Sequence, residues 1–206
     1  MKRLTALLLI LVMLLGVCAL SGCGSYNNTQ GSVIVCLDET QAPKTVENFL
    51  TLVDAKFYDG LTMHRIIENF MIQGGDPKAD GTGGSDNKIE GEFIANGHLN
   101  TLWHKRGVIS MARSNGYDTA SSQFFICHTD ENVSQLDGQY AAFGWVVEGM
   151  EVVDAIATAE YTFTDDNGGV AADKQPEIVS IRRTSYGDGS DGHVYVEIVF
   201  AYHSDN

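Results

Sequence analysis

Several residues in the first half of the chain place a cation, an amide and a bulky apolar group at the alternate spacing of a β-strand. Arg65, Met71 and Gln73 all lie at odd-numbered positions, so in extended strands joined by a tight turn their side chains can face the same way. Gln123 and Phe125 repeat this alternation later in the chain. An apolar floor with a few directed hydrogen-bond donors is typical of a groove that binds a small molecule or a peptide. The pattern contains no obvious nucleophile and therefore favours binding over hydrolysis.

Hydrophobic periodicity indicates the elements that must position these side chains. Pro43 suits the first turn of a helix, and apolar residues follow it at i, i+3, i+4 and i+7, which predicts a helix with one face on a core. A second short amphipathic helix is expected over residues 149–157. Strands are expected around Arg65 and Gln73 and over residues 32–37, 107–112, 122–127, 140–146, 176–183 and 193–202, the last two as a hairpin. Many short strands with two helices indicate a barrel or a sandwich.

Residues 1–22 have the pattern of an export signal peptide, because two basic residues precede an uncharged apolar run that is too short for a comfortable membrane span. Residues 20–23 resemble the lipobox of bacterial lipoproteins, which implies diacylglycerol on Cys23 and cleavage just before it. Residues 23–31 would then be a flexible tether. We therefore expect an exported protein, lipid-anchored to the outer side of a bacterial cytoplasmic membrane or of another envelope membrane. Ordinary secretion and an uncleaved anchor are the alternatives.

The chain is acidic, which narrows its partners. Its 206 residues include 27 acidic and 13 basic ones, for a formal net charge of −14. We therefore expect no nucleic-acid partner, and the length suits one domain. Cys36 and Cys127 also belong to the exported part, and we expect both to be free thiols. No spacing of Cys, His and carboxylates predicts a metal site, and no cofactor is expected.

A series of short motifs carries a family resemblance. They lie at residues 42–49, 64–67, 70–76, 81–84, 106–112, 122–126, 136–138 and 143–144. In this order they make residues 32–183 similar to the cyclophilin-type peptidyl-prolyl cis–trans isomerases. The resemblance implies a mainly β fold, a closed eight-stranded antiparallel barrel capped by two helices, with a groove on its outer surface. We expect residues 184–206 to be a C-terminal extension that can contain an additional strand, and we expect a monomer.

The resemblance also implies a catalytic groove. Its catalytic residues match Arg65, Gln73 and Phe70. Its substrate-binding residues match Met71, Ala112, Arg113, Gln123, Phe125, Leu136 and Tyr140. The implied reaction is rotation about the bond that precedes a proline, with Arg65 donating to the prolyl nitrogen only while the amide is twisted. His64 belongs to the same motif at opposite parity, so we expect a buried imidazole with satisfied hydrogen bonds.

Arg113 and Tyr140 are among the positions that depart from the usual pattern of the family. Arg113 stands where Asn is usual, and it would add a cation at the groove rim that favours acidic residues near the proline. Tyr140 stands where many eukaryotic members have His, and it keeps an aromatic wall in the groove. These departures affect the rim, while the catalytic set matches the family.

We expect the protein to accelerate rotation of X-Pro bonds in exported, proline-containing polypeptides. The alternative is a chaperone module of the same fold that binds proline-containing segments with little turnover. A secreted hydrolase is a third class, which would need Ser110, Ser121 or Ser122 to recruit a histidine. No nucleophile-elbow motif supports it.

Overall fold

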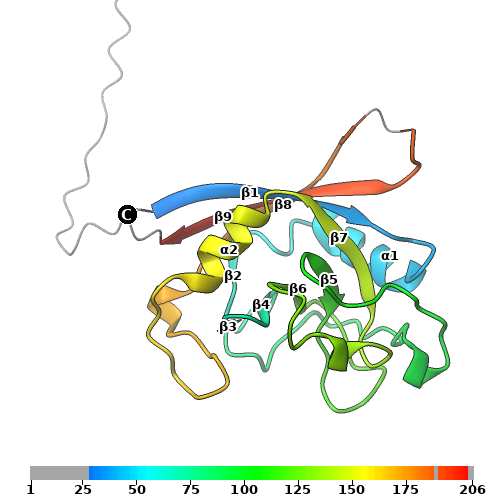
Figure 1. Ribbon diagram of the computed structural model, residues 1–206, viewed down its shortest axis with the longest axis horizontal. Coiled ribbons are helices and arrows are strands. Elements are labelled where there is room, and N and C mark those ends of the chain that lie inside the picture. Colours follow the sequence, from blue (N-terminus) through cyan, green and yellow to red (C-terminus); the bar gives the residue numbers. More distant parts are fainter. Residues whose placement is uncertain (1–27, 188–189, 204–206) are drawn as a thin grey trace, which may run out of the picture.

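The computed structural model describes residues 28–187 and 190–203, which form a curled antiparallel β-sheet with two α-helices (Figure 1). The strands are β1 (Asn28–Leu37), β2 (Leu61–Thr62), β3 (Arg65–Ile67), β4 (Met71–Gly74), β5 (Val108–Met111), β6 (Phe124–Cys127), β7 (Ala142–Glu148), β8 (Glu177–Thr184) and β9 (Val194–His203). The helices are α1 (Pro43–Asp54) and α2 (Met150–Thr158), with short 3-10 helices at Ile94–Asn96, Ser134–Leu136 and Ala172–Lys174. The two helices and the hairpin of β8 with β9 confirm the sequence predictions.

The described strands pair in the order β2-β8-β9-β1-β7-β5-β6-β4-β3. The prediction of a closed eight-stranded barrel is therefore wrong, because the sheet has nine strands and is open. Within the described residues no ladder joins the edge strands β2 and β3, and a single isolated bridge between Thr62 and Asp76 links the β2 edge to the chain after β4. The edge strands contain two and three residues, which is too short for a closing row of hydrogen bonds.

The ninth strand, β9, lies between β1 and β8 and pairs with both. Its register on β1 runs from His203 opposite Asn28 to Val194 opposite Leu37, so the start of β1 lies beside the end of β9 (Figure 1). Alternate β9 residues point into the core, as expected for strand parity. Residues 28–31, which we predicted as part of the tether, belong to β1, because β9 supplies hydrogen-bond partners for their backbone.

Alternation within the central strands separates a main core from a second, smaller apolar cluster. Ile72 and Ile126 point into the main core, which α1 and α2 also line, whereas Met71 and Phe125 belong to the smaller cluster. Helix α2 packs against β1, β4 and β9, and α1 packs against β8. Neither helix of the described residues is long and apolar enough to span a membrane. The smaller cluster forms the floor of the site described next.

Both Cys36 and Cys127 are buried and free, as predicted. Cys127 belongs to the smaller apolar cluster, and burial raises the pKa of its thiol to about 12. Cys36 lies in β1 next to the β7 strand. In the described part of the chain, no group of three or more His, Cys, Asp and Glu residues has an arrangement that could hold a metal ion.

Candidate active site

A groove of about 870 Å³ lies on the face of the sheet that carries the smaller apolar cluster. Nine of the predicted site residues line it: Arg65, Phe70, Met71, Gln73, Ala112, Arg113, Phe125, Leu136 and Tyr140. The tenth, Gln123, lines an adjoining hollow of about 440 Å³ that shares Gln73, Ala112 and Arg113 with the groove. The structure thus brings all ten together. The predicted lipidation site, Cys23, lies outside the described residues.

Three polar side chains form a hydrogen-bonded row along one side of the groove. Strands β3 and β4 pair Arg65 with Gln73, and the Arg65 Nη1 donates to Gln73 Oε1 at 3.2 Å. Gln73 Nε2 donates to Gln123 Oε1 at 2.9 Å. Gln123 Nε2 in turn donates to the carbonyls of Gly81 and Gly83 at 3.0 and 2.8 Å. The row confirms the shared face predicted from parity, and it fixes the orientation of both amides.

The guanidinium of Arg65 is half-buried and held from two sides. Besides its contact with Gln73, its Nε donates to the Asn167 carbonyl at 2.8 Å. Among the described residues, no acceptor is found for Nη2, so this donor is available to a ligand in the groove. Burial lowers the pKa of Arg65, but an arginine keeps its charge at neutral pH. A partly desolvated cation interacts more strongly with a nearby dipole than one in water does.

The apolar part of the groove is a pocket with aromatic walls. Met71, Phe125 and Leu136 are buried, with 1%, 4% and 7% of their surface exposed. The Phe125 and Tyr140 rings meet edge to face with 5.9 Å between their centroids, a favourable aromatic geometry. Phe70 is half-buried and lines the same groove. Such a pocket can hold a small apolar ring while a flanking polar row binds the backbone.

A histidine that the sequence analysis did not single out supports this pocket from behind. His104 stacks against Phe125 at a centroid distance of 6.0 Å. Its Nδ1 lies 2.9 Å from Asp137 Oδ1 and its Nε2 lies 3.0 Å from the Ser110 hydroxyl, so the three groups have the connectivity of a Ser-His-Asp triad. Ser110 is completely buried, however, and a nucleophile must reach its substrate. Burial also lowers the pKa of His104, and this chain of hydrogen bonds therefore positions Phe125.

The glycine-rich turn next to the groove wraps around a carboxylate of the protein itself. Asp76 is 1% exposed and accepts hydrogen bonds from the backbone N–H groups of Lys78, Gly81 and Gly83 at 2.8, 2.7 and 3.1 Å. A Cβ atom on Gly83 would lie 2.0 Å from Asp76 Oδ1, which explains the glycine at this position. The carbonyls of Gly81 and Gly83 in this turn accept hydrogen bonds from the side-chain amide of Gln123.

A family profile described as "Cyclophilin type peptidyl-prolyl cis-trans isomerase/CLD" matches residues 25–184. The chain belongs to this cyclophilin family. A peptidyl-prolyl cis–trans isomerase of Helicobacter pylori is 41% identical over 134 residues, which are 64% of this chain and 78% of that protein. Peptidyl-prolyl cis-trans isomerase A of Dickeya dadantii is 41% identical over 133 residues, which are 63% of this chain and 68% of that protein. The protein is accordingly a peptidyl-prolyl isomerase.

A solved cyclophilin structure shows the same fold. The crystal structure of a cyclophilin type peptidyl-prolyl cis-trans isomerase from Cryptosporidium parvum, obtained in the presence of the dipeptide Ala-Pro, superposes with a TM-score of 0.59 and 25% identity. The match covers 85% of this chain and 99% of that one. The family match ends at residue 184, so β9 lies outside the matched region.

The guanidinium of Arg113 is surrounded by aromatic rings and carbonyls. It lies 4.7 Å from the Tyr140 ring centroid and 5.3 Å from those of Phe93 and Tyr117. Its Nε and Nη2 both donate to the Gln139 carbonyl at 3.1 Å. Because the protein itself surrounds this guanidinium, the contacts argue against an attraction of Arg113 for acidic residues of the substrate. That attraction stays a prediction. In this cyclophilin Arg113 supports the Tyr140 wall of the groove.

Two features of the site differ from what the sequence suggested. His64 is buried as predicted, with 4% exposed, but the expectation of satisfied hydrogen bonds is wrong, since neither ring nitrogen has a hydrogen-bond partner among the described residues. Burial lowers the pKa of His64, so a neutral imidazole lines the groove. Asn167 was missed entirely, because it contacts Arg65 through a backbone carbonyl and a side-chain motif carries no signal for that.

Proposed function

We propose that the groove accelerates rotation of X-Pro bonds by non-covalent stabilisation of the twisted amide. The arrangement that carries the proposal is the Arg65 guanidinium, fixed by Gln73 and Asn167 with Nη2 available, beside a buried apolar pocket. The pocket of Met71 and Phe125 would hold the proline ring. Solved in the presence of the dipeptide Ala-Pro, the Cryptosporidium parvum relative supports proline-containing polypeptides as the substrates.

The chemistry of the bond explains why one well-placed donor is enough. Amide resonance gives a barrier of roughly 18–20 kcal/mol, and spontaneous rotation about X-Pro takes tens to hundreds of seconds. Twisting the bond localises the nitrogen lone pair, so a donor aimed at that nitrogen binds the twisted state better than either planar state. Lowering the barrier by about 7 kcal/mol would accelerate rotation by about five orders of magnitude.

Replacing Arg65 in the purified full-length protein tests this proposal. Cis–trans exchange of a proline peptide is measured in a protease-coupled assay. Arg65→Ala should lower kcat/KM by about a hundredfold to a thousandfold, as removal of one transition-state donor does elsewhere. Arg65→Lys should recover little, because an ammonium lacks the rigid fork that reaches Gln73 and the Asn167 carbonyl together.

Arg183→Ala is the matched control, since this exposed arginine pairs with Asp54 at 2.8 Å outside the groove lining. It should keep wild-type turnover. Wild-type exchange no faster than the spontaneous rate would support the alternative of a proline-binding chaperone module. Unchanged turnover in Arg65→Ala would reject this residue as the principal catalyst.

We also propose that the protein is exported, carries lipid on Cys23 and acts as a monomer on exported polypeptides at the outer side of the cytoplasmic or another envelope membrane. The lipobox-like residues 20–23 support lipidation. Mass spectrometry of the mature N-terminus should find diacylglycerol on Cys23, and Cys23→Ser should remove it. Cys18→Ser is the matched control and should leave it in place. A mature chain with an unmodified Cys23 would contradict lipidation.

A further inference from the structure

The turn between β3 and β4 places Phe70 at the groove, and the chain after β6 holds that turn. The Asn69 N–H donates to His128 Nδ1 at 3.0 Å, and the Thr129 hydroxyl donates to the Asn69 carbonyl at 3.1 Å. The backbone N–H of His128 donates to the Phe70 carbonyl at 2.9 Å. Asn69 has a φ of 60°, in the left-handed region that non-glycine residues rarely adopt. The backbone before Phe70 is thus held in an uncommon conformation by these partners.

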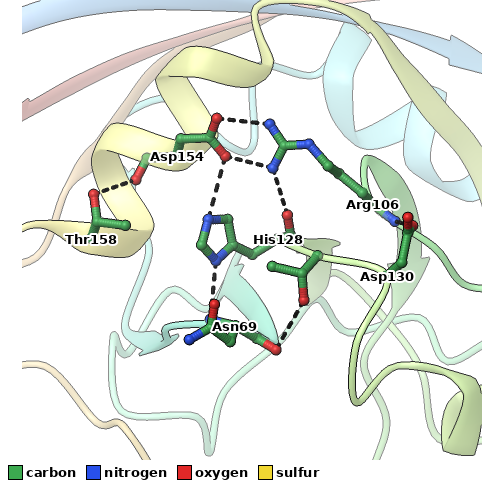
Figure 2. A network of polar contacts seen from close by, with 7 residues as sticks. Asn69, Arg106, His128, Asp130, Asp154 and Thr158 are labelled. Atoms are coloured by element: carbon green, nitrogen blue, oxygen red, sulfur yellow. Dashed lines mark hydrogen bonds and ion pairs between the residues drawn. The ribbon is translucent and has the colours of Figure 1, made fainter.

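Figure 2 shows how His128 is oriented from its other side. Its Nε2 lies 3.3 Å from Oδ1 of Asp154 on α2, and Asp154 accepts two further hydrogen bonds from the Arg106 guanidinium at 2.6 and 2.7 Å. Arg106 Nη1 also donates to the His128 carbonyl at 2.7 Å. Because Nδ1 accepts from Asn69, the proton of the neutral ring must be on Nε2, facing Asp154. Only this tautomer makes both contacts.

We propose that His128 is a positioning residue, which in its neutral form holds the turn before Phe70 and on protonation releases it. A proton on Nδ1 would point at the Asn69 N–H, so that hydrogen bond must break. The uncommon conformation of Asn69 would then lose a partner that maintains it, and Phe70 would leave its place in the groove. The inference deepens the proposed function and rests on it, because the effect of Phe70 is measured through isomerisation.

The charges around His128 determine which of its contacts is lost on protonation. Asp154 faces Nε2 from α2, and the Arg106 guanidinium reaches the His128 carbonyl from the chain before β5. Asp130, in the chain after β6, accepts a hydrogen bond from the backbone N–H of Arg106 at 2.7 Å. Glu68 precedes the left-handed residue in the turn. The Arg106 guanidinium lowers the pKa of Asp154, so this carboxylate accepts from Nε2 in either state of the ring. Protonation therefore keeps the contact of Nε2 with Asp154 on α2 and removes the contact of Nδ1 with the Asn69 N–H.

Two substitutions separate the two ring nitrogens. His128→Asn carries an amide oxygen near the position of Nδ1 and can accept from Asn69 at every pH, whereas His128→Gln places its amide near Nε2 and loses that acceptor. Exchange of an Ala-Pro peptide is followed by NMR with the full chain from about pH 8 to about pH 5, where histidines titrate. Thr158→Val is the matched control, because its hydroxyl donates to the Asp154 carbonyl at 2.8 Å and leaves the imidazole contacts intact.

On acidification, wild-type kcat/KM should fall by about fivefold to tenfold, as expected for the loss of one hydrogen bond. His128→Asn should lack this fall, and His128→Gln should be lower by about the same factor already at about pH 8. Thr158→Val should follow the wild type. An acid response that persists in His128→Asn would assign it to His64 or His104 and overturn the proposal. Wild-type turnover of His128→Gln at about pH 8 would overturn it as well.

The backbone amide signal of Asn69 tests the positioning role of His128 independently of turnover, and its wild-type response needs no variant. This signal should move with pH in the wild type and stay constant in His128→Asn. Absence of turnover at every pH with a titrating Asn69 signal would refute the proposed function and support the positioning role of His128. Wild-type turnover with an Asn69 signal that does not respond to pH would refute only the positioning role of His128.

Discussion

The carboxy-terminal strand β9 lies beyond the region that matches the family, yet it stands in the middle of the sheet. It pairs with β1 along its whole length and with β8 on its other side, and its inward side chains Val196, Ile198 and Phe200 are completely buried. We predict that Phe200→Ala lowers the free energy of unfolding by about 3–5 kcal/mol. The physical reason is the loss of buried apolar contact together with the cavity that the missing ring leaves.

Val199→Ala is the matched control in the same strand. Its side chain is on the opposite face and only half-buried, so the expected loss is about 1 kcal/mol or less. Urea unfolding followed by tryptophan fluorescence gives both values, since the chain has two tryptophans, Trp103 and Trp145. The midpoint should fall at an unchanged slope if the substitution alters stability alone.

Equal losses for Phe200→Ala and Val199→Ala would refute the reasoning that β9 is part of the core. A chain that ends at Thr184 provides a second check. Without β9 the edges of β1 and β8 would be unpaired and exposed, which promotes association between chains. A soluble truncated protein with unchanged stability would show that the inserted strand is dispensable.

Three further predictions concern the site and its surroundings. Arg113→Lys keeps the charge but loses the planar guanidinium that lies between the Tyr140 ring and the Gln139 carbonyl. The free energy of unfolding should therefore fall by about 1–2 kcal/mol, and KM for a proline peptide should rise. Wild-type values in urea unfolding and in peptide kinetics would contradict this prediction. Burial lowers the pKa of His64 and of His104, so the unfolded chain binds more protons than the folded protein. The stability that the two neutral histidines contribute is therefore present above about pH 6.5 and is lost as the pH falls below it. Urea unfolding that shows rising stability on acidification would exclude this linkage. Burial raises the pKa of Cys127 to about 12, so a thiol reagent at about pH 8 should label Cys127 only after unfolding. Rapid labelling of Cys127 in the native protein, located by peptide mapping, would contradict this prediction.

Local patterns in the sequence predict much of this architecture. Pro43 and the helical spacing of the apolar residues after it place α1, and strand parity puts Arg65 and Gln73 on one face. These features depend on backbone geometry within a few residues, so they can be read without knowing the fold. The resemblance to cyclophilins then identified ten residues that the structure gathers at one groove and its adjoining hollow.

Local patterns in the sequence could not predict which distant segments pair with one another. The closed barrel was predicted from the family resemblance, and no local pattern corrects it, because a strand pattern does not show that β9 pairs between β1 and β8. The unpaired nitrogens of His64 and the aromatic surroundings of Arg113 were missed for the same reason.

The sequence by itself therefore determined which residue types face the groove and which chemistry they can perform. Tertiary structure alone decided how those residues are held: Arg65 by a carbonyl of Asn167 and Phe70 by a turn that His128 grips. The physical reason is that periodicity depends on neighbours along the chain, whereas hydrogen-bond partners and burial depend on segments that only folding brings together.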